Sequence, residues 1–507
     1  MAQLFSLDDM RKASRSILSP FHFVLTATIL ALALVIARAQ TNVALTTIYT
    51  FSPRVSSTNS DGVFPRAGLV EGSDGYYYGT TYNGGLYGWG TIYRISPSGG
   101  FATVAHFTSA IGYSCTAPLV QASDGTFYGT AMGGGAKFYG TVFKVTTNGT
   151  LTRLWSFTGG NDGSYPAAGL VLGADGALYG ATPNGGALGF GTVFKITTNG
   201  LLTTLVTFGN TNGATPSGSL LQLQDDNGNF LGTTEKGGRA GAGTVFKMAP
   251  SGALIFSASF GYTNGFDPTC GLVLGADGNF YGTTRFGGPG NGTNGFGSVF
   301  RMTPAGQLTT VAFFNNTSGS LPTAGLMRTR DGQLYGISSF SAYRFMADGT
   351  LAGVAMFIMV NYQFPYGIFP HGTLLEGKDG VLYGVAEQGG TNTSQGLIYR
   401  LDLRPSLGAK KAANGNFNLS WGAIPGQRYQ LQYSFDLMNW ISLGGPLFGV
   451  GAPLGATDVA PSDFQRCYRV LLCPDGMAPW RVDRKQWRSR VGSVHDGDVT
   501  RKHKQIV

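Results

Sequence analysis

Two kinds of side chain that could bind a ligand recur at a regular interval along this sequence of 507 residues. The first is a lysine or arginine at one position about every fifty residues. If these cations lie on one face, they form a positive ring that could hold an acidic ligand. Alternatively, each long stem packs between neighbouring elements while its charged head pairs with an aspartate or a carbonyl. The basic positions are Arg94, Lys144, Lys195, Lys247, Arg301, Arg344 and Arg400.

The second kind is an aromatic residue set between glycines, directly before a segment such as G-T-V-F. Flat rings on loops of small residues can stack on the apolar face of a sugar. Alternatively, the rings fill gaps between neighbouring elements. The fourth unit has Ala242 at this position. The aromatic residues of the first, second, third and fifth units are Trp89, Tyr139, Phe190 and Phe296.

Carboxylates also recur, but their pattern favours a structural role. Seven aspartates open glycine-containing turns, in which the side chain accepts bonds from nearby backbone N–H groups. Seven equivalent acids are not expected to be catalytic, and an enzyme would need acids that break the repeat. The candidates for such a set are Glu235, Glu376 and Glu387 with Arg285 or His371. The turn aspartates are Asp74, Asp124, Asp175, Asp226, Asp277, Asp331 and Asp379.

The body of the chain lacks the residues that several kinds of active site require. Only His106 and His371 lie outside the terminal segments, so we expect neither a metal cluster nor a His-dependent catalytic triad. No P-loop or G-x-S-x-G motif is present, and we predict no cofactor. The net charge of +9 is concentrated in the two terminal segments, so a nucleic-acid partner is not expected. Cys467 and Cys473 flank one expected strand, too far apart for a bridge, and no disulfide framework is predicted.

The elements that must position these residues are the short strands of a tandem repeat. The pattern GLV, DG, YG, TT, GG, GTVFK and LTTL recurs along residues 61–403, for example in 68–107 and 169–208. Its turn glycines are about fifty residues apart, which gives seven units of four expected strands each. Four-strand units of this length are typical of β-propeller blades. The sequence therefore predicts an all-β fold, a seven-bladed β-propeller followed by a small β-sandwich.

The two ends of the repeat predict that the ring closes. The last unit ends at residues 397–403 and lacks its fourth strand, while residues 44–51 are a spare copy of that strand. Pairing these segments gives one blade built from both ends of the repeat and leaves no exposed sheet edge. The alternative, an open solenoid, needs polar capping repeats, and the sequence offers none.

The repeat resembles that of the choice-of-anchor tandem repeat GloVer-containing proteins, which are secreted bacterial proteins. The motif reads DGTFYGTAMGGGAKFYGTVFKVTTNGTLTRLWSF at residues 124–157, and its copies cover about 340 residues. The sixth unit departs most, because it has lost the G-G loop between Gly336 and Arg344. The resemblance implies export and surface display, and it implies no established activity.

Four segments follow from these patterns. Residues 1–39 are interpreted as a signal peptide because a basic start precedes an apolar run and an A-R-A site, with an uncleaved membrane anchor as the alternative. Residues 40–404 form the propeller. Residues 405–473 are expected to form a small immunoglobulin- or fibronectin-III-like sandwich, and 474–507 a disordered basic tail.

The sequence as a whole predicts a secreted or cell-surface monomer that acts as a non-catalytic binding or structural module. Its expected ligand is a glycan or a surface protein, bound by the aromatic and basic positions. One alternative is an extracellular polysaccharide-degrading enzyme, either a lyase or a glycoside hydrolase. A purely structural component of the cell envelope is the third possibility.

Overall fold

The computed structural model describes residues 44–225, 227–288, 295–315, 319–357, 364–390, 395–404, 407–411, 416–421, 423, 427–434, 440–449, 454–458 and 467–473. These residues form strands, turns and loops, with no helix among them. Accordingly, no helix in the described ranges is long and apolar enough to cross a membrane. The predicted signal peptide, the predicted tail and Asp226 lie outside the described residues.

Seven four-stranded antiparallel sheets lie between Ala44 and Asp402 in the described part of the chain, and we number them as units 1 to 7. Unit 1 contains β2 (Val70–Glu71), β3 (Tyr77–Thr80), β4 (Thr91–Ile95) and β5 (Phe101–His106). Unit 2 contains β6 (Val120–Gln121), β7 (Phe127–Ala131), β8 (Thr141–Val145) and β9 (Leu151–Ser156). Unit 3 contains β10 (Val171–Leu172), β11 (Leu178–Thr182), β12 (Thr192–Ile196) and β13 (Leu202–Thr207).

The remaining units follow the same order. Unit 4 contains β14 (Leu221–Gln222), β15 (Phe230–Thr234), β16 (Thr244–Met248) and β17 (Leu254–Ser259). Unit 5 contains β18 (Val273–Leu274), β19 (Phe280–Thr284), β20 (Ser298–Met302) and β21 (Leu308–Phe313). Unit 6 contains β22 (Met327–Arg328), β23 (Leu334–Ile337), β24 (Ser341–Phe345) and β25 (Leu351–Met356), and unit 7 contains β26 (Phe364–Glu376), β27 (Leu382–Gly390), β28 (Leu397–Asp402) and β1 (Ala44–Thr50).

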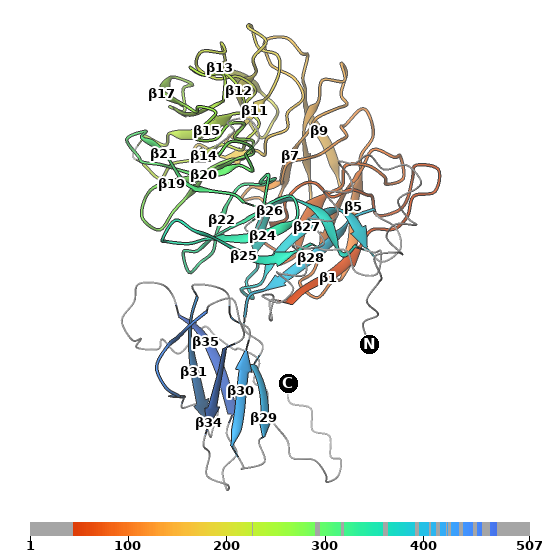
Figure 1. Cartoon of the computed structure of the whole chain (residues 1–507). Helices are drawn as coiled ribbons and strands as arrows, with labels where there is room; N and C mark the ends of the chain where they lie inside the picture. The colour runs from red at the N-terminus through yellow and green to blue at the C-terminus, as the bar shows by residue number, and fades with distance from the viewer. Residues whose placement is uncertain are drawn as a thin grey trace, which may run out of the picture.

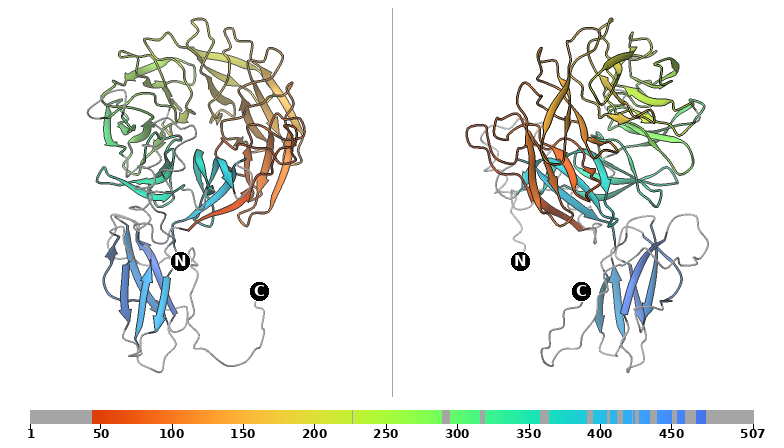
Figure 2. Two further views of the ribbon diagram at one scale, coloured as in Figure 1. Left: turned by 45° about the vertical axis from the view of Figure 1, so that its right-hand side comes forward. Right: turned by 180° about the vertical axis from the view of Figure 1, so that it is seen from behind.

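Unit 7 joins the two ends of the repeat. Strand β1 pairs antiparallel with β28, and Ala44 lies opposite Asp402. The predicted pairing of residues 44–51 with 397–403 is therefore present. The sheets follow one another around a ring in which β1 and β28 lie side by side (Figures 1 and 2). Unit 7 also differs from the others, because β26 and β27 are much longer than their equivalents.

The repeated glycine and threonine residues explain how each sheet packs. In unit 3, Gly180 lies opposite Phe194, and a Cβ at Gly180 would be 2.6 Å from the Phe194 ring. The glycine of each Y-G pair thus makes room for the aromatic residue of the next strand. Thr182 and Thr192 form a buried hydroxyl pair at 2.8 Å, which satisfies two polar groups between these strands. Equivalent pairs join Thr81 to Thr91, Thr234 to Thr244 and Thr284 to Ser298.

Neighbouring units are held together by hydrogen bonds as well as by apolar packing. The Thr130 hydroxyl in unit 2 donates to the carbonyl of Ala168 at 3.0 Å, and the Thr233 hydroxyl in unit 4 donates to the carbonyl of Cys270 at 2.9 Å. Buried clusters such as that of Phe208 and Phe246 fill the space between strands of adjacent sheets. These contacts bury both faces of the sheets, and the many apolar residues of the short strands provide the core.

Each unit has two different ends, which unit 3 illustrates. At the turn end, residues 173–177 connect β10 to β11 and residues 197–201 connect β12 to β13. At the loop end, residues 183–191 connect β11 to β12, and residues 208–220 lead to unit 4. We use the terms turn end and loop end in this sense for all units.

The C-terminal part contains two further sheets. One has the order β29 (Leu407–Lys411), β30 (Phe417–Trp421) and β34 (Leu454–Asp458). In the other, β31 (Arg428–Ser434) pairs with β32 (Ile441–Ser442), β33 (Leu447–Phe448) and β35 (Cys467–Cys473). Trp421, Tyr429 and Tyr468 are buried together between these sheets, and the Tyr468 hydroxyl donates to Asp458 at 2.8 Å. This part lies beside the ring of units (Figure 2).

Candidate functional site

The two predicted sets of binding residues lie at opposite ends of the units. Phe190 lies two residues before β12 at the loop end, whereas Lys195 lies near the other end of this strand, at the turn end. The same separation holds for Trp89 and Arg94 around β4. The structure therefore does not bring the aromatic and basic positions into one site, although their closeness in sequence allowed that interpretation.

At the turn end, basic residues of several units contact an aspartate or a tyrosine of their own unit. In unit 3, Lys195 Nζ lies 2.6 Å from Asp175 Oδ2, which also accepts a 2.8 Å bond from the Tyr179 hydroxyl. Burial opposes ionisation of Asp175, but the bonds from Lys195 and Tyr179 outweigh it and lower the pKa of this carboxyl. In unit 1, the Arg94 guanidinium lies 4.7 Å from the Tyr76 ring. These contacts agree with the structural interpretation of the basic positions.

In unit 4, the aspartate that pairs with the repeated basic residue is Asp225. Asp226 lies outside the described residues, and it is Asp225 that accepts bonds from the backbone and side chain of Asn229. Lys247 Nζ lies 3.4 Å from Asp225. The turn of unit 4, residues 223–229, is two residues longer than the equivalent turn of unit 3, and Asp225 and Asp175 both lie three positions after the preceding strand.

Arg344 differs from the other basic positions because it is fully buried. Its guanidinium donates to Gln333 Oε1 in the same unit, and its Nη1 donates to Gln427 Oε1 at 2.5 Å. Gln427 belongs to the C-terminal part, directly before β31. The turn end of unit 6 therefore contacts the C-terminal sheets through a residue that elsewhere in the repeat stays partly exposed.

At the loop end, the four predicted aromatic residues remain partly exposed, and two of them, Trp89 and Tyr139, pack on a ring of the next unit. The Trp89 ring lies 4.7 Å from that of Tyr113, and the Tyr139 ring 5.6 Å from that of Tyr165. Between 36% and 40% of the surface of Trp89, Tyr139, Phe190 and Phe296 stays accessible. The rings thus partly fill the gaps between units and still present a surface to solvent.

The loop end also carries residues that break the repeat. Glu387 accepts a 2.5 Å bond from Arg66 and lies 2.9 Å from His371 Nε2. Burial disfavours the charged form, but the bonds from His371 and Arg66 dominate and lower the pKa of Glu387 to about 2. The Arg66 guanidinium also lies 4.0 Å from the Tyr82 ring. Sequence analysis named Glu387 and His371 but missed Arg66, whose only signal is that the equivalent positions hold small residues or His371.

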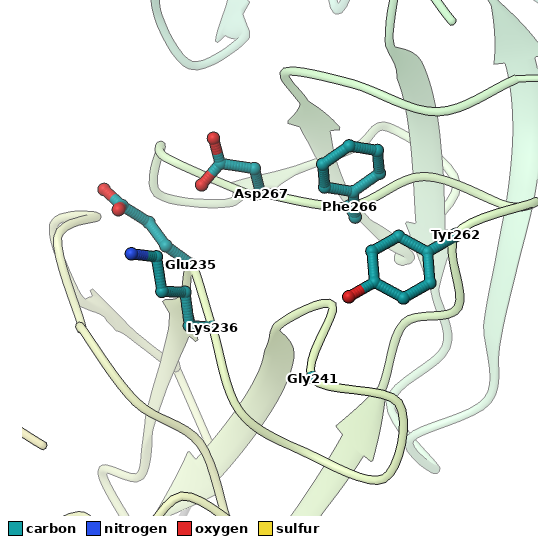
Figure 3. Close-up of a pocket in the computed structure, with 6 residues that line it drawn as sticks. All are labelled: Glu235, Lys236, Gly241, Tyr262, Phe266 and Asp267. Atoms are coloured by element: carbon teal, nitrogen blue, oxygen red, sulfur yellow. The ribbon is translucent and has the colours of Figure 1, made fainter. Parts of the chain in front are cut away.

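A second repeat-breaking group lines a pocket of about 310 Å³ between units 4 and 5 (Figure 3). Burial raises the pKa of Glu235, and the charge of Asp267 acts in the same direction. Burial also raises the pKa of Asp267, while Arg285 and Lys236 partly oppose this. Sequence analysis named Glu235 and Arg285 but missed Asp267, because nothing local distinguishes it from a loop aspartate.

The third candidate acid lies elsewhere. Glu376 is at the turn end, where it accepts a 2.7 Å bond from the backbone N–H of Arg330. The three candidate glutamates therefore do not meet in one site. Among the described residues, no three or more His, Cys, Asp or Glu side chains are grouped to hold a metal ion. Cys115 and Cys270 are unpaired.

The comparison with known families rests on the repeat itself. The sequence profile of the Gloeobacter/Verrucomicrobia repeat matches residues 36–225 and again residues 222–434. The chain belongs to this family. The matched ranges cover all seven units and extend into the C-terminal sheets, and they support the resemblance found in the sequence. No curated protein matches the chain.

The chain is also similar, at low sequence identity, to several solved structures. A gluconolactonase from Xanthomonas campestris is 13% identical, with 73% of this chain and 92% of that chain covered and a TM-score of 0.38. The extracellular domain of a putative one-component system from B. thetaiotaomicron is 11% identical over 86% and 57% of the two chains, with a TM-score of 0.42. A polysaccharide lyase described as an ulvan lyase is 8% identical over 68% and 96%, with a TM-score of 0.38. Similarity at this level assigns no activity to this chain.

Proposed function

We propose that this repeat protein is a secreted or cell-surface, non-catalytic module whose loop end binds a glycan. Its seven sheets are the blades of a closed seven-bladed propeller, and its C-terminal sheets form a small immunoglobulin-like sandwich. The observation that carries the proposal is the partial exposure of Trp89, Tyr139, Phe190 and Phe296 at one equivalent loop position. A ring that is already held by the next unit loses little freedom when a sugar stacks on it.

The charge of the two ends supports the loop end as the binding surface. At the turn end, Lys195 and Lys247 already pair with aspartates, so they offer little net positive charge to an acidic ligand. At the loop end, exposed apolar residues surround the aromatic positions, among them Leu86, Phe138 and Leu188. Such a surface favours apolar contact with sugar rings over attraction by charge.

A glycan array probed with the full chain tests this proposal. Wild-type protein is expected to bind a restricted set of glycans, and the double variant Trp89→Ala/Tyr139→Ala is expected to lose at least ten-fold in affinity. Leu201→Ala is the control, because Leu201 is an exposed apolar residue at the opposite, turn end of unit 3. Absence of glycan binding, or equal losses in the double variant and the control, contradicts the proposal.

A second candidate function, a polysaccharide-degrading enzyme, is favoured by the group around Glu387. The carboxylate of Glu387 orients His371 through its Nε2 atom, and a histidine oriented in this way can act as a general base. Arg66 lies in the same group and could bind an acidic sugar. Cleavage of a polysaccharide that is lost in His371→Ala but retained in the double aromatic variant favours this function over binding alone.

Export is tested independently of ligand binding. Cell fractionation with an antibody against residues 44–404 is expected to place the protein outside the cytoplasm. Deletion of residues 1–39 is expected to retain it inside the cell. Cytoplasmic wild-type protein contradicts the proposed location.

A further inference from the structure

The pocket between units 4 and 5 lies next to the position at which the repeat lacks its aromatic residue. The equivalent position holds Ala242, which is almost completely buried. In unit 1 the equivalent ring, Trp89, packs on Tyr113 of the next unit. Ala242 itself does not line the pocket, but its neighbour Gly241 does, and the pocket has a volume of about 310 Å³. Its lining residues are Glu235, Lys236, Gly241, Tyr262, Phe266 and Asp267.

The backbone around Ala242 keeps the geometry of the other units. The carbonyl of Ala242 accepts a 3.2 Å bond from the N–H of Asp267, as the carbonyl of Phe190 accepts a 2.9 Å bond from Thr215. Asp267 and Thr215 both have positive φ angles, 62° and 58°. The chain therefore follows the same path at Ala242 as in unit 3.

Two walls of different chemistry face this space. Tyr262 and Phe266 form one wall, with their rings edge to face at 5.1 Å, and Phe266 is supported by the stacked ring of Phe286 at 5.2 Å. Glu235, Asp267 and Lys236 form the other (Figure 3). Glu235 stands where other units have Tyr82 or Met132, and Asp267 where they have Tyr165 or Leu321. Two departures from the repeat, at 235 and 267, thus meet in one pocket, and a third, at 242, lies next to the lining residue Gly241.

We propose that this pocket binds a single neutral pyranose residue of a glycan. The apolar face of the sugar stacks on Tyr262 or Phe266, and its hydroxyl groups bond to Glu235 and Asp267. The volume is near the lower limit for ligand pockets, about 300 Å³, which suits one ring. The two carboxyls disfavour an acidic sugar, and Lys236 with nearby Arg285 disfavours a cationic one. This assignment rests on the proposed glycan binding and names the sugar class at one position.

Saturation-transfer NMR on the full chain tests the assignment with methyl β-D-glucopyranoside, methyl β-D-galactopyranoside and methyl α-D-mannopyranoside as probes. Glucuronic acid and glucosamine serve as the charged comparisons. At least one neutral glycoside is expected to give a signal that exceeds both charged sugars. No signal from any neutral glycoside, or a stronger signal from a charged sugar, overturns the proposal.

The variant Tyr262→Ala removes one ring of the aromatic wall, and it is expected to fold because Tyr262 is 44% exposed. It is expected to weaken binding of the neutral glycoside at least ten-fold. Phe448→Ala, which removes an exposed ring of the C-terminal sheets, is the matched control and is expected to retain binding. Asparagine tolerates the positive φ angle at position 267, so Asp267→Asn is expected to fold. It is expected to weaken binding of the neutral glycoside about five-fold.

The outcomes separate this pocket from the wider proposal. If wild type binds glycans on the array and Tyr262→Ala binds the glycoside as well as wild type, the pocket assignment is wrong and glycan binding stands. If wild type binds neither the array nor the glycosides, both proposals fail. Thermal unfolding of each variant confirms that a loss of binding is not a loss of fold.

Discussion

The two ends of the sheets use recurring residues in different ways. At the turn end, one arrangement of aspartate, tyrosine and cation recurs, as in Asp175, Tyr179 and Lys195. At the loop end, residues of neighbouring units form unlike groups: Glu387 contacts Arg66 and His371, while Glu235 and Asp267 line a pocket. A residue type that recurs in every unit stabilises every unit, whereas a departure from the repeat creates a site that occurs once. The candidate binding residues of this protein therefore lie at the loop end, in the repeated aromatic positions and in the departures from the repeat.

At the turn end, the buried Arg344 departs from the repeated arrangement, and its removal is expected to have the largest effect on stability. Arg344→Ala removes the guanidinium that donates to the side-chain oxygens of Gln333 and Gln427. We expect this loss to lower the free energy of unfolding by about 3 kcal/mol. Urea denaturation measures this loss. Limited proteolysis is expected to release the C-terminal sheets faster from the variant.

The matched control is Lys144→Ala, which alters the equivalent, partly exposed position of unit 2. It is expected to change stability by less than about 0.5 kcal/mol. Equal effects of the two substitutions would contradict a special role of Arg344 in holding the C-terminal sheets.

The Glu387 group at the loop end is expected to give stability that depends on pH. The pKa of Glu387 is about 2 in the folded chain against 4.5 for the free side chain. Folding thus favours the ionised form, so its contribution is complete above pH 4.5 and is lost as the pH falls toward about 2. Glu387→Gln is expected to cost about 2 kcal/mol at pH 7 and progressively less in acid, as measured by thermal unfolding across this range.

Glu71→Gln is the control for this pH dependence, because Glu71 pairs with Lys378, whose side chain is 72% exposed. Such a pair contributes little to stability, and the control is expected to follow the wild-type profile. A constant difference between Glu387→Gln and wild type at all pH values would show that the Glu387 carboxylate is not the titrating group.

The repeated arrangement of the turn end is expected to have the smallest effect per residue. Asp175→Ala removes the bonds to Tyr179, Lys195 and the N–H of Ala177, at an expected cost of about 1 kcal/mol. Lys195→Met removes only the ion pair and is expected to cost less than about 0.5 kcal/mol. Neither variant is expected to change glycan binding. A loss of binding on the glycan array in either variant would indicate that the basic positions take part in binding.

The sequence predicted much of the fold because the repeat supplies the same evidence many times. The D-G turns, the Y-G and G-T-V-F segments and the spare strand at residues 44–51 each correspond to observed pairings. The candidate site was predicted less completely. Glu387 and His371 were named and do meet, but Glu376 lies at the other end of its sheet. Arg66 and Asp267 were missed, since each reaches its partners across the boundary between units.

What the sequence determined by itself is the local structure: strand order, turn residues and the end that each position occupies within a unit. These follow from periodicity and backbone preferences that act over a few residues. Only the tertiary structure decided which departures from the repeat meet. Arg66 lies 321 positions from Glu387, and Arg344 lies 83 positions from Gln427. Such contacts depend on how the units close into a ring and pack on the C-terminal sheets, which no local pattern encodes.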